Sequence, residues 1–244
     1  MLNIALLGAS GRMGKAVSSL VGEAADMAVS GRWDEHSGGL AEALVDASVA
    51  IDFSHPSCTV ELCDALREAS VPLVTGTTGL TAQGEAALAS LAAVVPVLHD
   101  GNMSVAVQLL ATLVARAAAA LPDYDIEVSE SHHRFKVDAP SGTAIKLGAA
   151  AAAARDAALD DVAVFDRHGR DSARRNGSIG FAVQRGGNVI GEHTVSLFGQ
   201  HDRLELRHIA DDRRLFADGA VRAARWLVDQ SPGKYNVSDM LAEI

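Results

Sequence analysis

Short apolar runs alternate with stretches of helical periodicity along the N-terminal part of the chain. The apolar runs are nearly continuous, which is typical of parallel strands that are covered on both faces. The stretches between them are rich in alanine, a strong helix former. Strands are predicted at Leu2–Leu7, Met27–Trp33, Val49–Phe53, Val71–Thr75 and Val94–Leu98, and helices at Met13–Ala24, Thr59–Ala69 and Thr81–Leu91. This alternation predicts an α/β domain with a doubly wound parallel sheet.

The pattern changes after Asn102. Longer helical stretches are followed by three consecutive runs in which polar and apolar residues alternate. Such runs predict a smaller α+β domain with a mixed sheet that is covered on one face. The predicted helices are Ser104–Ala120 and Thr143–Ala158, and the predicted strands are Tyr124–Glu130, Ile179–Arg185, Glu192–Phe198 and Arg203–Ile209.

The C-terminal segment Arg213–Asp229 is again amphipathic with helical spacing. We expect it to pack back against the first domain. The first domain would then comprise residues 1–103 and 213–244, and the second domain residues 104–212. A cleft between two such domains is a preferred place for a small ligand.

Composition narrows the classes of function. The net charge of −10 argues against a nucleic-acid partner, which needs a basic face to displace phosphate counterions. No run reaches the roughly 18 apolar residues that span a bilayer, so no membrane partner is expected. The chain begins with a predicted strand and no basic leader, so we expect a cytoplasmic protein. Cys58 and Cys63 fit neither a redox nor a zinc motif and are predicted to be buried small hydrophobes.

A glycine-rich turn, GASGRMG at Gly8–Gly14, follows the first strand and opens the first helix. Glycine suits this place because the turn is tight and a side chain would hold a pyrophosphate away from the helix N-terminus. Asp34 ends the second strand about 20 residues further on, where a carboxylate bonds the adenosine ribose. Arg12 is placed to reach a 2′-phosphate instead. A structural turn and a solvated Asp34–Arg12 pair would be the plainer interpretation.

These features predict a Rossmann-like domain with NADH and/or NADPH as cofactor. Glu35 and His36 follow Asp34, where an NADP-selective site favours arginine. We therefore expect NAD to be well used, with NADP as an open alternative.

Two further loops leave the carboxyl ends of predicted strands, where open α/β sheets bind ligands. Gly76–Gly79 follows the fourth strand and Asp100–Met103 follows the fifth. Their small and hydroxyl-bearing residues suit a nicotinamide ribose and carboxamide, and Met103 could pack on the ring; ordinary turn chemistry would also explain them. The predicted cofactor-binding residues are Gly8, Ala9, Ser10, Gly11, Arg12, Met13, Asp34, Gly76, Thr77, Thr78, Asp100, Gly101, Asn102 and Met103.

The stretch ESHHRFKVDAPSGTA at residues 130–144 contains the densest group of side chains that could bind a ligand or transfer a proton. Its PSGT segment places backbone amides and the Thr143 hydroxyl at a helix N-terminus, which is a natural carboxylate site. His133 and Lys136 can add positive charge beside it, so a small dicarboxylate is a suitable substrate. His132 is the candidate proton donor, because an ordinary histidine pKa of about 6.5 is easily tuned for work near neutral pH. The predicted substrate-binding residues are His133, Ser141, Gly142 and Thr143.

A zinc site is the more specific alternative for the adjacent pair His132 and His133. Adjacent side chains on an extended segment point in opposite directions, and no further ligand cluster lies nearby in the sequence. We therefore predict no metal. A polar surface loop without function is the remaining alternative.

The histidine stretch resembles the signature of the 4-hydroxy-tetrahydrodipicolinate (dihydrodipicolinate) reductases. The resemblance extends over nearly the whole chain. The matching segments are GASGRMG, DFSHP at 52–56, GTTGL at 76–80, GNMSVAV at 101–107, RRNGSIGFAVQRGGNVIGEHTVSLFG at 174–199 and RHIADDRRLFADGAVRAARWL at 207–227.

The resemblance implies an oxidoreductase of lysine and diaminopimelate biosynthesis that is a homotetramer built through the sheet of the second domain. It implies catalytic roles for His132 as proton donor and Lys136 as its cationic partner. The implied reaction is reduction of 4-hydroxy-tetrahydrodipicolinate to tetrahydrodipicolinate, with loss of water. Another two-domain amino-acid or sugar dehydrogenase would lack the PSGT turn. A nicotinamide-sensing protein without turnover would have no need of His132 and Lys136.

Overall fold

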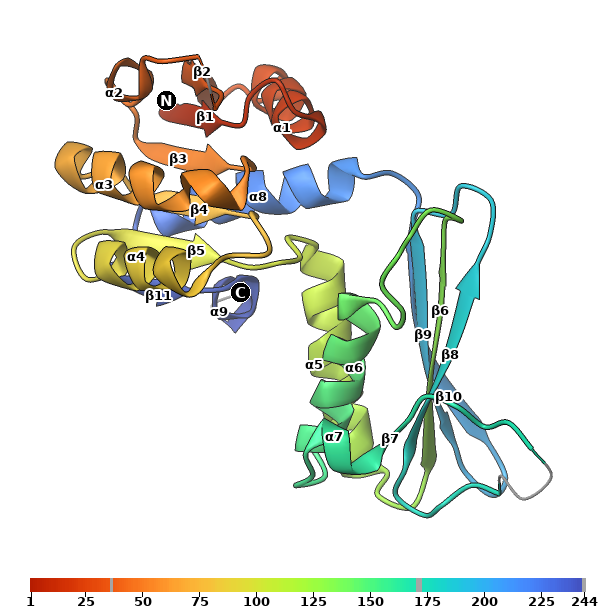
Figure 1. Ribbon diagram of the computed structural model, residues 1–244. Coiled ribbons are helices and arrows are strands. Elements are labelled where there is room, and N and C mark those ends of the chain that lie inside the picture. Colours follow the sequence, from red (N-terminus) through yellow and green to blue (C-terminus); the bar gives the residue numbers. More distant parts are fainter. Residues whose placement is uncertain (36, 170–172, 243–244) are drawn as a thin grey trace. The chain divides into compact units, whose positions relative to one another are not determined.

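The computed structural model describes residues 1–35, 37–169 and 173–242. The chain forms two compact units (Figure 1), one comprising Met1–Val105 with Arg214–Ile244 and the other Ala106–Arg213. The predicted amphipathic tail is α8 (Arg214–Leu227), which packs on α1 (Arg12–Glu23) within the first unit.

The first unit contains a six-stranded sheet whose strands are all parallel. Its order is β11-β5-β4-β3-β1-β2. The strands are β1 (Leu2–Leu7), β2 (Met27–Trp33), β3 (Val49–Asp52), β4 (Leu73–Thr75), β5 (Pro96–His99) and β11 (Gly233–Tyr235). The predicted doubly wound parallel sheet is thus confirmed. The short edge strand β11 was not predicted, because its three residues GKY have neither apolar character nor alternation.

Successive side chains on each strand enter two separate cores, because neighbouring residues point to opposite faces. Ile4 and Leu6 of β1 pack with α1 and α8, whereas Ala5 and Leu7 pack on the other face. The first core also takes residues from α9 (Val237–Ala242). The second core is covered by α2 (Leu40–Ala43), α3 (Thr59–Ala69) and α4 (Ala82–Ala92). Helices on both faces bury most of the four central strands, which accounts for their continuous apolar runs.

The second unit contains a five-stranded mixed sheet in the order β10-β9-β6-β8-β7. Strand β6 pairs in parallel with β8 and antiparallel with β9. The strands are β6 (Asp125–His132), β7 (Ala163–Val164), β8 (Ile179–Arg185), β9 (Gly191–Phe198) and β10 (Arg203–Ala210). The predicted mixed sheet is confirmed.

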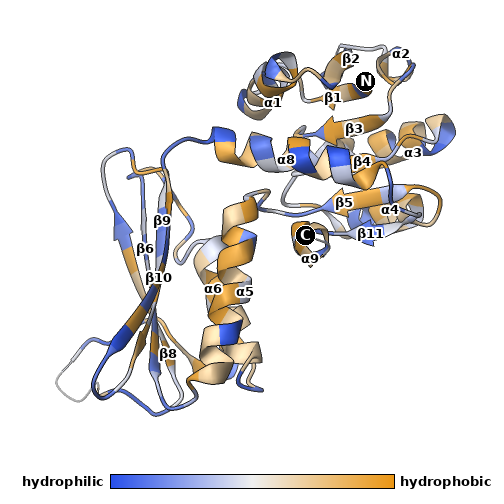
Figure 2. Cartoon of the chain, turned by 180° about the vertical axis from the view of Figure 1, so that it is seen from behind, coloured by the Kyte–Doolittle hydropathy of each residue, from blue (hydrophilic) through white to orange (hydrophobic). Residues whose placement is uncertain are grey.

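Helices α5 (Val105–Ala120) and α6 (Gly142–Ala153) cover one face of this sheet (Figure 1). Their apolar character contrasts with the hydrophilic residues along the sheet (Figure 2). The opposite face presents polar side chains such as Ser129, Thr194 and Arg207, which are neighbours through the strand register. A short helix, α7 (Leu159–Val162), leads into β7.

The predicted helix Thr143–Ala158 is wrong at its C-terminal end, since α6 stops at Ala153. Arg155 turns away and its guanidinium donates hydrogen bonds to the carbonyl groups of Ala118, Leu121 and Tyr124. These carbonyls lie at and beyond the C-terminus of α5, where the helix leaves them without internal partners. A tertiary contact therefore decides where the alanine-rich segment ends.

Cys58, at the end of the 3₁₀ turn η1 (Pro56–Cys58), and Cys63 on α3 are both buried free thiols, as predicted. Burial raises the pKa of both thiols, that of Cys63 to about 12. Within the described ranges, no helix is both long and apolar enough to cross a membrane.

Candidate functional site

The glycine-rich turn joins β1 to α1 through a backbone that requires glycine at two positions. Gly8 has a φ of +76°, and a Cβ on it would lie 2.7 Å from the carbonyl oxygen of Phe53. A Cβ on Gly14 would lie 2.2 Å from the carbonyl oxygen of Gly8. The backbone of the turn is therefore packed tightly against both the helix and the next loop. Gly11 is the N-cap of α1 and caps it with no side chain, so the first amides of the helix remain suited to an anion.

Asp34 lies beside this turn, at the end of β2. Its carboxylate accepts hydrogen bonds from the backbone N–H of Ser10 at 2.9 Å and from the Ser10 hydroxyl at 2.8 Å. An open groove of about 480 Å³ runs past these groups. It is lined by Ser10, Gly11, Asp34, Glu35, Ser37, Ser54 and His55.

The groove has an acidic wall. Glu35 stands next to Asp34, and its carboxylate accepts a hydrogen bond from the Ser57 hydroxyl at 3.2 Å. Arg12, predicted to reach a 2′-phosphate, is exposed and is not one of the lining residues. His36, the other residue in the specificity prediction, lies outside the described residues.

Asp52, at the end of β3, holds the first of the two predicted nicotinamide loops and was missed by sequence reasoning. Its buried carboxylate accepts hydrogen bonds from the hydroxyls of Thr75 (2.7 Å) and Thr77 (2.9 Å) and from the backbone N–H of Ser54 (2.8 Å). One carboxylate thus joins the loops that follow β3 and β4. The sequence signal that could have identified Asp52 was its place in the DFSHP segment, which is one of the segments that match the family.

The second predicted loop, Asp100–Met103, is held by its own side chains. The Asp100 carboxylate accepts from the backbone N–H of Asn102 at 3.0 Å, and the Asn102 side chain accepts from the N–H of Ser104 at 2.9 Å. The Met103 side chain is buried in the core of the first unit, where a Cβ on Gly219 of α8 would lie 1.7 Å from the Met103 carbonyl oxygen. Met103 therefore fixes the loop to the core.

In the second unit, the histidine stretch begins on β6 and ends at the N-terminus of α6. Strand β6 buries alternate residues, and the last of these is His132. The Ser141 hydroxyl caps α6 by accepting a hydrogen bond from the N–H of Ala144 at 3.2 Å. Gly142 and Thr143 form the first turn of α6. The structure thus brings the predicted proton donor and the predicted carboxylate turn together.

Between these two ends lie the cationic residues of the loop, of which Lys136 is partly buried. Lys136 forms an ion pair with Asp138 at 2.7 Å. His133 is partly buried and its ring lies 6.4 Å from that of Phe135. Phe135 and Val137 are largely exposed on either side of Lys136.

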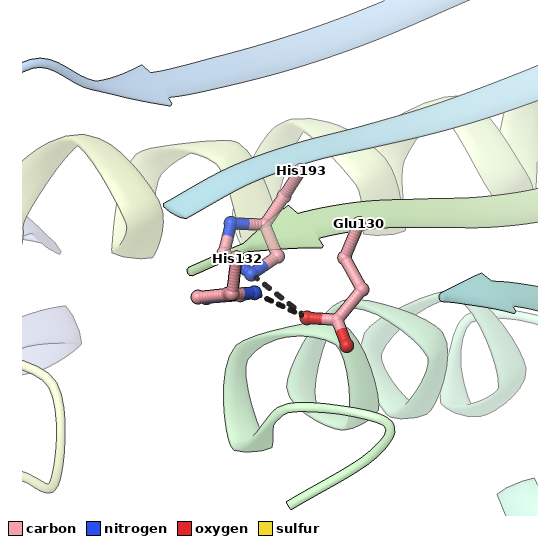
Figure 3. A group of neighbouring side chains, drawn as sticks. All are labelled: Glu130, His132 and His193. Atoms are coloured by element: carbon pink, nitrogen blue, oxygen red, sulfur yellow. Dashed lines mark ion pairs between the residues drawn. The ribbon is translucent and has the colours of Figure 1, made fainter. Parts of the chain in front are cut away.

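A buried carboxylate, Glu130, connects the elements of this site. Its Oε1 accepts hydrogen bonds from the N–H of Ser141 at 3.0 Å and from the Arg185 guanidinium at 2.9 Å. Its Oε2 lies 2.9 Å from Nδ1 of His132 and 3.7 Å from Nε2 of His193 (Figure 3). The His193 ring nitrogen Nε2 is also 3.1 Å from the Ser141 hydroxyl.

Sequence reasoning missed Glu130, Arg185 and His193 as site residues. Glu130 opens the histidine motif two positions before His132, so the two share a face of the strand. Arg185 and His193 are distant in the chain and reach the site only because β8 and β9 both pair with β6.

Glu130, His132 and His193 place three potential metal-ligand atoms within 4.8 Å of one another. The sequence shows no further ligand cluster near the histidine pair, but strand pairing brings His193 beside Glu130 and His132. However, the Arg185 guanidinium is already bonded to Glu130, so a metal cation would enter beside a fixed positive charge. The arrangement favours a proton-handling group over a metal centre.

Burial and charge oppose each other at these groups. Burial would raise the pKa of Glu130, but hydrogen bonds from Ser141 and Arg185 outweigh burial and leave the pKa below its ordinary value. Burial lowers the pKa of His132, Glu130 counteracts this, and Lys136 and Arg185 lower it further. Burial also lowers the pKa of His193, to about 4.

Comparison with known proteins covers the whole chain. Residues 2–103 match the family model "Dihydrodipicolinate reductase, N-terminus", and residues 106–241 match "Dihydrodipicolinate reductase, C-terminus". A 4-hydroxy-tetrahydrodipicolinate reductase of Sulfurovum sp. (strain NBC37-1) is 41% identical over 253 residues, covering 99% of both chains. One of Sinorhizobium medicae (strain WSM419) is 49% identical over 202 residues, covering 82% of this chain and 74% of the relative.

A solved structure described as dipicolinate-bound dihydrodipicolinate reductase from Paenisporosarcina sp. TG-14 has the same fold. Its TM-score is 0.81 at 22% identity, over 98% of this chain and 99% of that one. The sequence matches extend through both units and include the glycine-rich turn of the first unit and the histidine stretch of the second. The chain therefore belongs to the dihydrodipicolinate reductase family.

Proposed function

We propose that this protein reduces 4-hydroxy-tetrahydrodipicolinate to tetrahydrodipicolinate with a reduced nicotinamide nucleotide. The observation that carries the proposal is the convergence of His132, the Lys136 loop and the N-terminus of α6 in a chain of this family. Together they provide an acid and an anion site in one place. Neither a sugar dehydrogenase nor a nicotinamide sensor needs this combination.

The nucleotide half of the site is assigned to the first unit. The turn from Gly8 to Met13 would hold the pyrophosphate at the N-terminus of α1, because helix N-termini stabilise anions. Asp34 would accept hydrogen bonds from the adenosine ribose. Residues 76–78 and 100–103 would line the nicotinamide half, and Asp52 braces the first of these two loops through Thr77.

The substrate half is assigned to the second unit. The N–H groups of Gly142 and Thr143 would bind one carboxylate of the substrate, and His133 would contact the substrate beside them. Ser141 supports this turn by capping α6. Lys136 would balance the charge that develops on the ring nitrogen, and His132 would deliver the proton. When bound, the nucleotide supplies the hydride; the chain supplies alignment and electrostatics.

We further propose that NADH is used in preference to NADPH. A 2′-phosphate would approach Asp34 and Glu35, and like charges repel. We also propose a homotetramer assembled through the open face of the second unit's sheet, as the family resemblance implies, in a cytoplasmic enzyme. The polar face that α5 and α6 leave uncovered is the surface that supports this assembly.

The activity can be tested by following the near-ultraviolet absorbance of NADH when the product of dihydrodipicolinate synthase is supplied. We expect rapid, substrate-dependent oxidation of NADH. His132→Gln should lower kcat by roughly 10²–10⁴, the usual contribution of a positioned acid. Lys136→Ala should impair both kcat and KM for the substrate. Wild-type protein that binds NADH without turnover would refute the proposal.

A further inference from the structure

The ion-pair contact between Glu130 and His132 is built from strand geometry. Both residues lie on β6 with their side chains on the same, buried face. The Glu130 side chain is only 1% exposed, and its Oε2 lies 2.9 Å from Nδ1 of His132. The contact has the length of a close ion pair without the alignment of a hydrogen bond. The interaction between Glu130 and His132 is therefore mainly electrostatic.

Glu130 is fixed from behind by two donors. The Ser141 N–H and the Arg185 guanidinium both bind Oε1, which leaves Oε2 turned toward the imidazoles. Hydrogen bonds of this kind favour the ionised form of a carboxylate. A buried carboxylate that stays ionised is a strong local source of negative charge, because screening by solvent is weak there.

His193 closes the other side of the cluster. Its ring makes an edge contact with that of His132, with 5.0 Å between centroids at an angle of 71°. Its Nε2 lies 3.1 Å from the Ser141 hydroxyl. His193 thereby links the orientation of His132 to the cap of α6, the element assigned to the substrate carboxylate.

We infer that Glu130, supported by His193, is the positioning residue for His132. Its carboxylate selects the Nδ1-protonated ring, leaves Nε2 to face the substrate and stabilises the imidazolium until its proton is delivered. Carboxylates orient catalytic and metal-binding histidines in the same way elsewhere. Gly191 on β9 leaves room for Nε2 of His132, because any other residue at this position would place its Cβ only 3.0 Å from that nitrogen. This inference rests on the proposed acid role of His132.

The sign of the charge effect follows from the groups around the ring. Glu130 and Asp138 raise the pKa of His132, whereas Lys136 and Arg185 lower it. His193 packs against the same ring, and the charge of His208 on β10 lowers the pKa of His193 in turn. Removing the charge of Glu130 leaves only Asp138 to oppose the two cations. The protonated form of His132 then becomes scarcer at a given pH.

The kinetic test compares Glu130→Gln with Glu130→Asp and with Glu127→Gln, a matched change on the same strand but on its other face. Glu130→Gln should lower kcat about 10²-fold, within the range for a positioned acid, with KM for NADH unchanged. The alkaline limb of the pH profile of kcat/KM should move to lower pH, because the pKa of His132 falls when Glu130 is neutralised. Glu130→Asp should keep the limb near its wild-type position, and Glu127→Gln should change neither quantity. Loss of kcat in Glu130→Gln without movement of the limb, or no loss, would overturn the inference.

Because removing a buried carboxylate can prevent folding, a second measurement uses the wild-type protein. Nitrogen-15 histidine NMR should show neutral His132 protonated on Nδ1, with its signals identified by their absence in His132→Gln. Protonation on Nε2 would overturn the inference. This readout needs no substrate, so it separates failure of the positioning role from failure of the proposed reaction.

Discussion

The side chains of this site owe their properties to burial and to charged neighbours, some close by in the chain and others remote. His132 is tuned by Glu130 on its own strand and by Arg185 on another, so its titration depends on the sheet. Asp34 and Glu35 show the same principle in the first unit. We propose that their adjacent carboxylates disfavour a 2′-phosphate in the groove.

Glu35→Arg should convert the acidic wall into a site for a 2′-phosphate. We expect KM for NADPH to fall by about tenfold, equivalent to about 1.4 kcal/mol, while KM for NADH changes little. Initial rates with each nucleotide measure this. Glu68→Arg on the exposed part of α3 makes the same change of charge away from the groove and should leave both KM values unaltered. Equal effects of the two variants would contradict the assigned role of Glu35.

Elements of the first unit meet at Asp52, where the loops after β3 and β4 share one carboxylate. Asp52→Asn replaces one acceptor oxygen by an amide that faces two hydroxyl groups. We expect the free energy of unfolding to fall by about 2 kcal/mol, the order of hydrogen bonds to a charged group. KM for NADH should rise by about tenfold, because the loops lose their common anchor.

Chemical denaturation and NADH titration measure these two effects. Asp64→Asn on α3, whose carboxylate pairs with Arg67 at the surface, is the matched control. If Asp52→Asn lowered stability but left KM for NADH at the wild-type value, the two loops would not act together on the nucleotide.

At the scale of the whole molecule, buried His193 links stability to pH. Its pKa in the folded protein is about 4, below the value of about 6.5 expected in an unfolded chain. Between these values the unfolded chain binds a proton that the folded chain does not. Stability is therefore complete above pH about 6.5 and falls by about 3 kcal/mol as the pH drops toward 4.

Thermal unfolding measured from neutral to acidic pH should show this loss as a falling Tm. His193→Gln should flatten the dependence, whereas His201→Gln, at an exposed turn, should preserve it. The same slope in both variants would show that acid destabilisation arises elsewhere.

The proposed tetramer can be tested by a substitution on the uncovered face of the second unit's sheet. Thr194→Arg places a large charge at the middle strand position between Ser129 and Arg207. We expect light scattering to give a tetramer for the wild type and a smaller species for the variant. Asp160→Arg on α7 should remain tetrameric. A monomeric wild type would refute the proposed assembly.

The sequence by itself determined the elements and the family. Continuous apolar runs between alanine-rich helices suffice for a doubly wound sheet, because burial on both faces leaves that mark on its central strands. The GASGRMG turn and the His132–Thr143 motif are local, so their residue types and spacing carry the chemistry directly. The resemblance of ESHHRFKVDAPSGTA to the family signature rests on the same locality.

Only the tertiary structure decided what surrounds those motifs. Strand pairing brings Arg185 and His193 to Glu130, and Arg155 ends α6 by bonding to the carbonyls of another helix. The edge strand β11 is polar and forms because β5 offers it an edge. Such contacts join residues far apart in the chain, and a one-dimensional pattern has no period that records them.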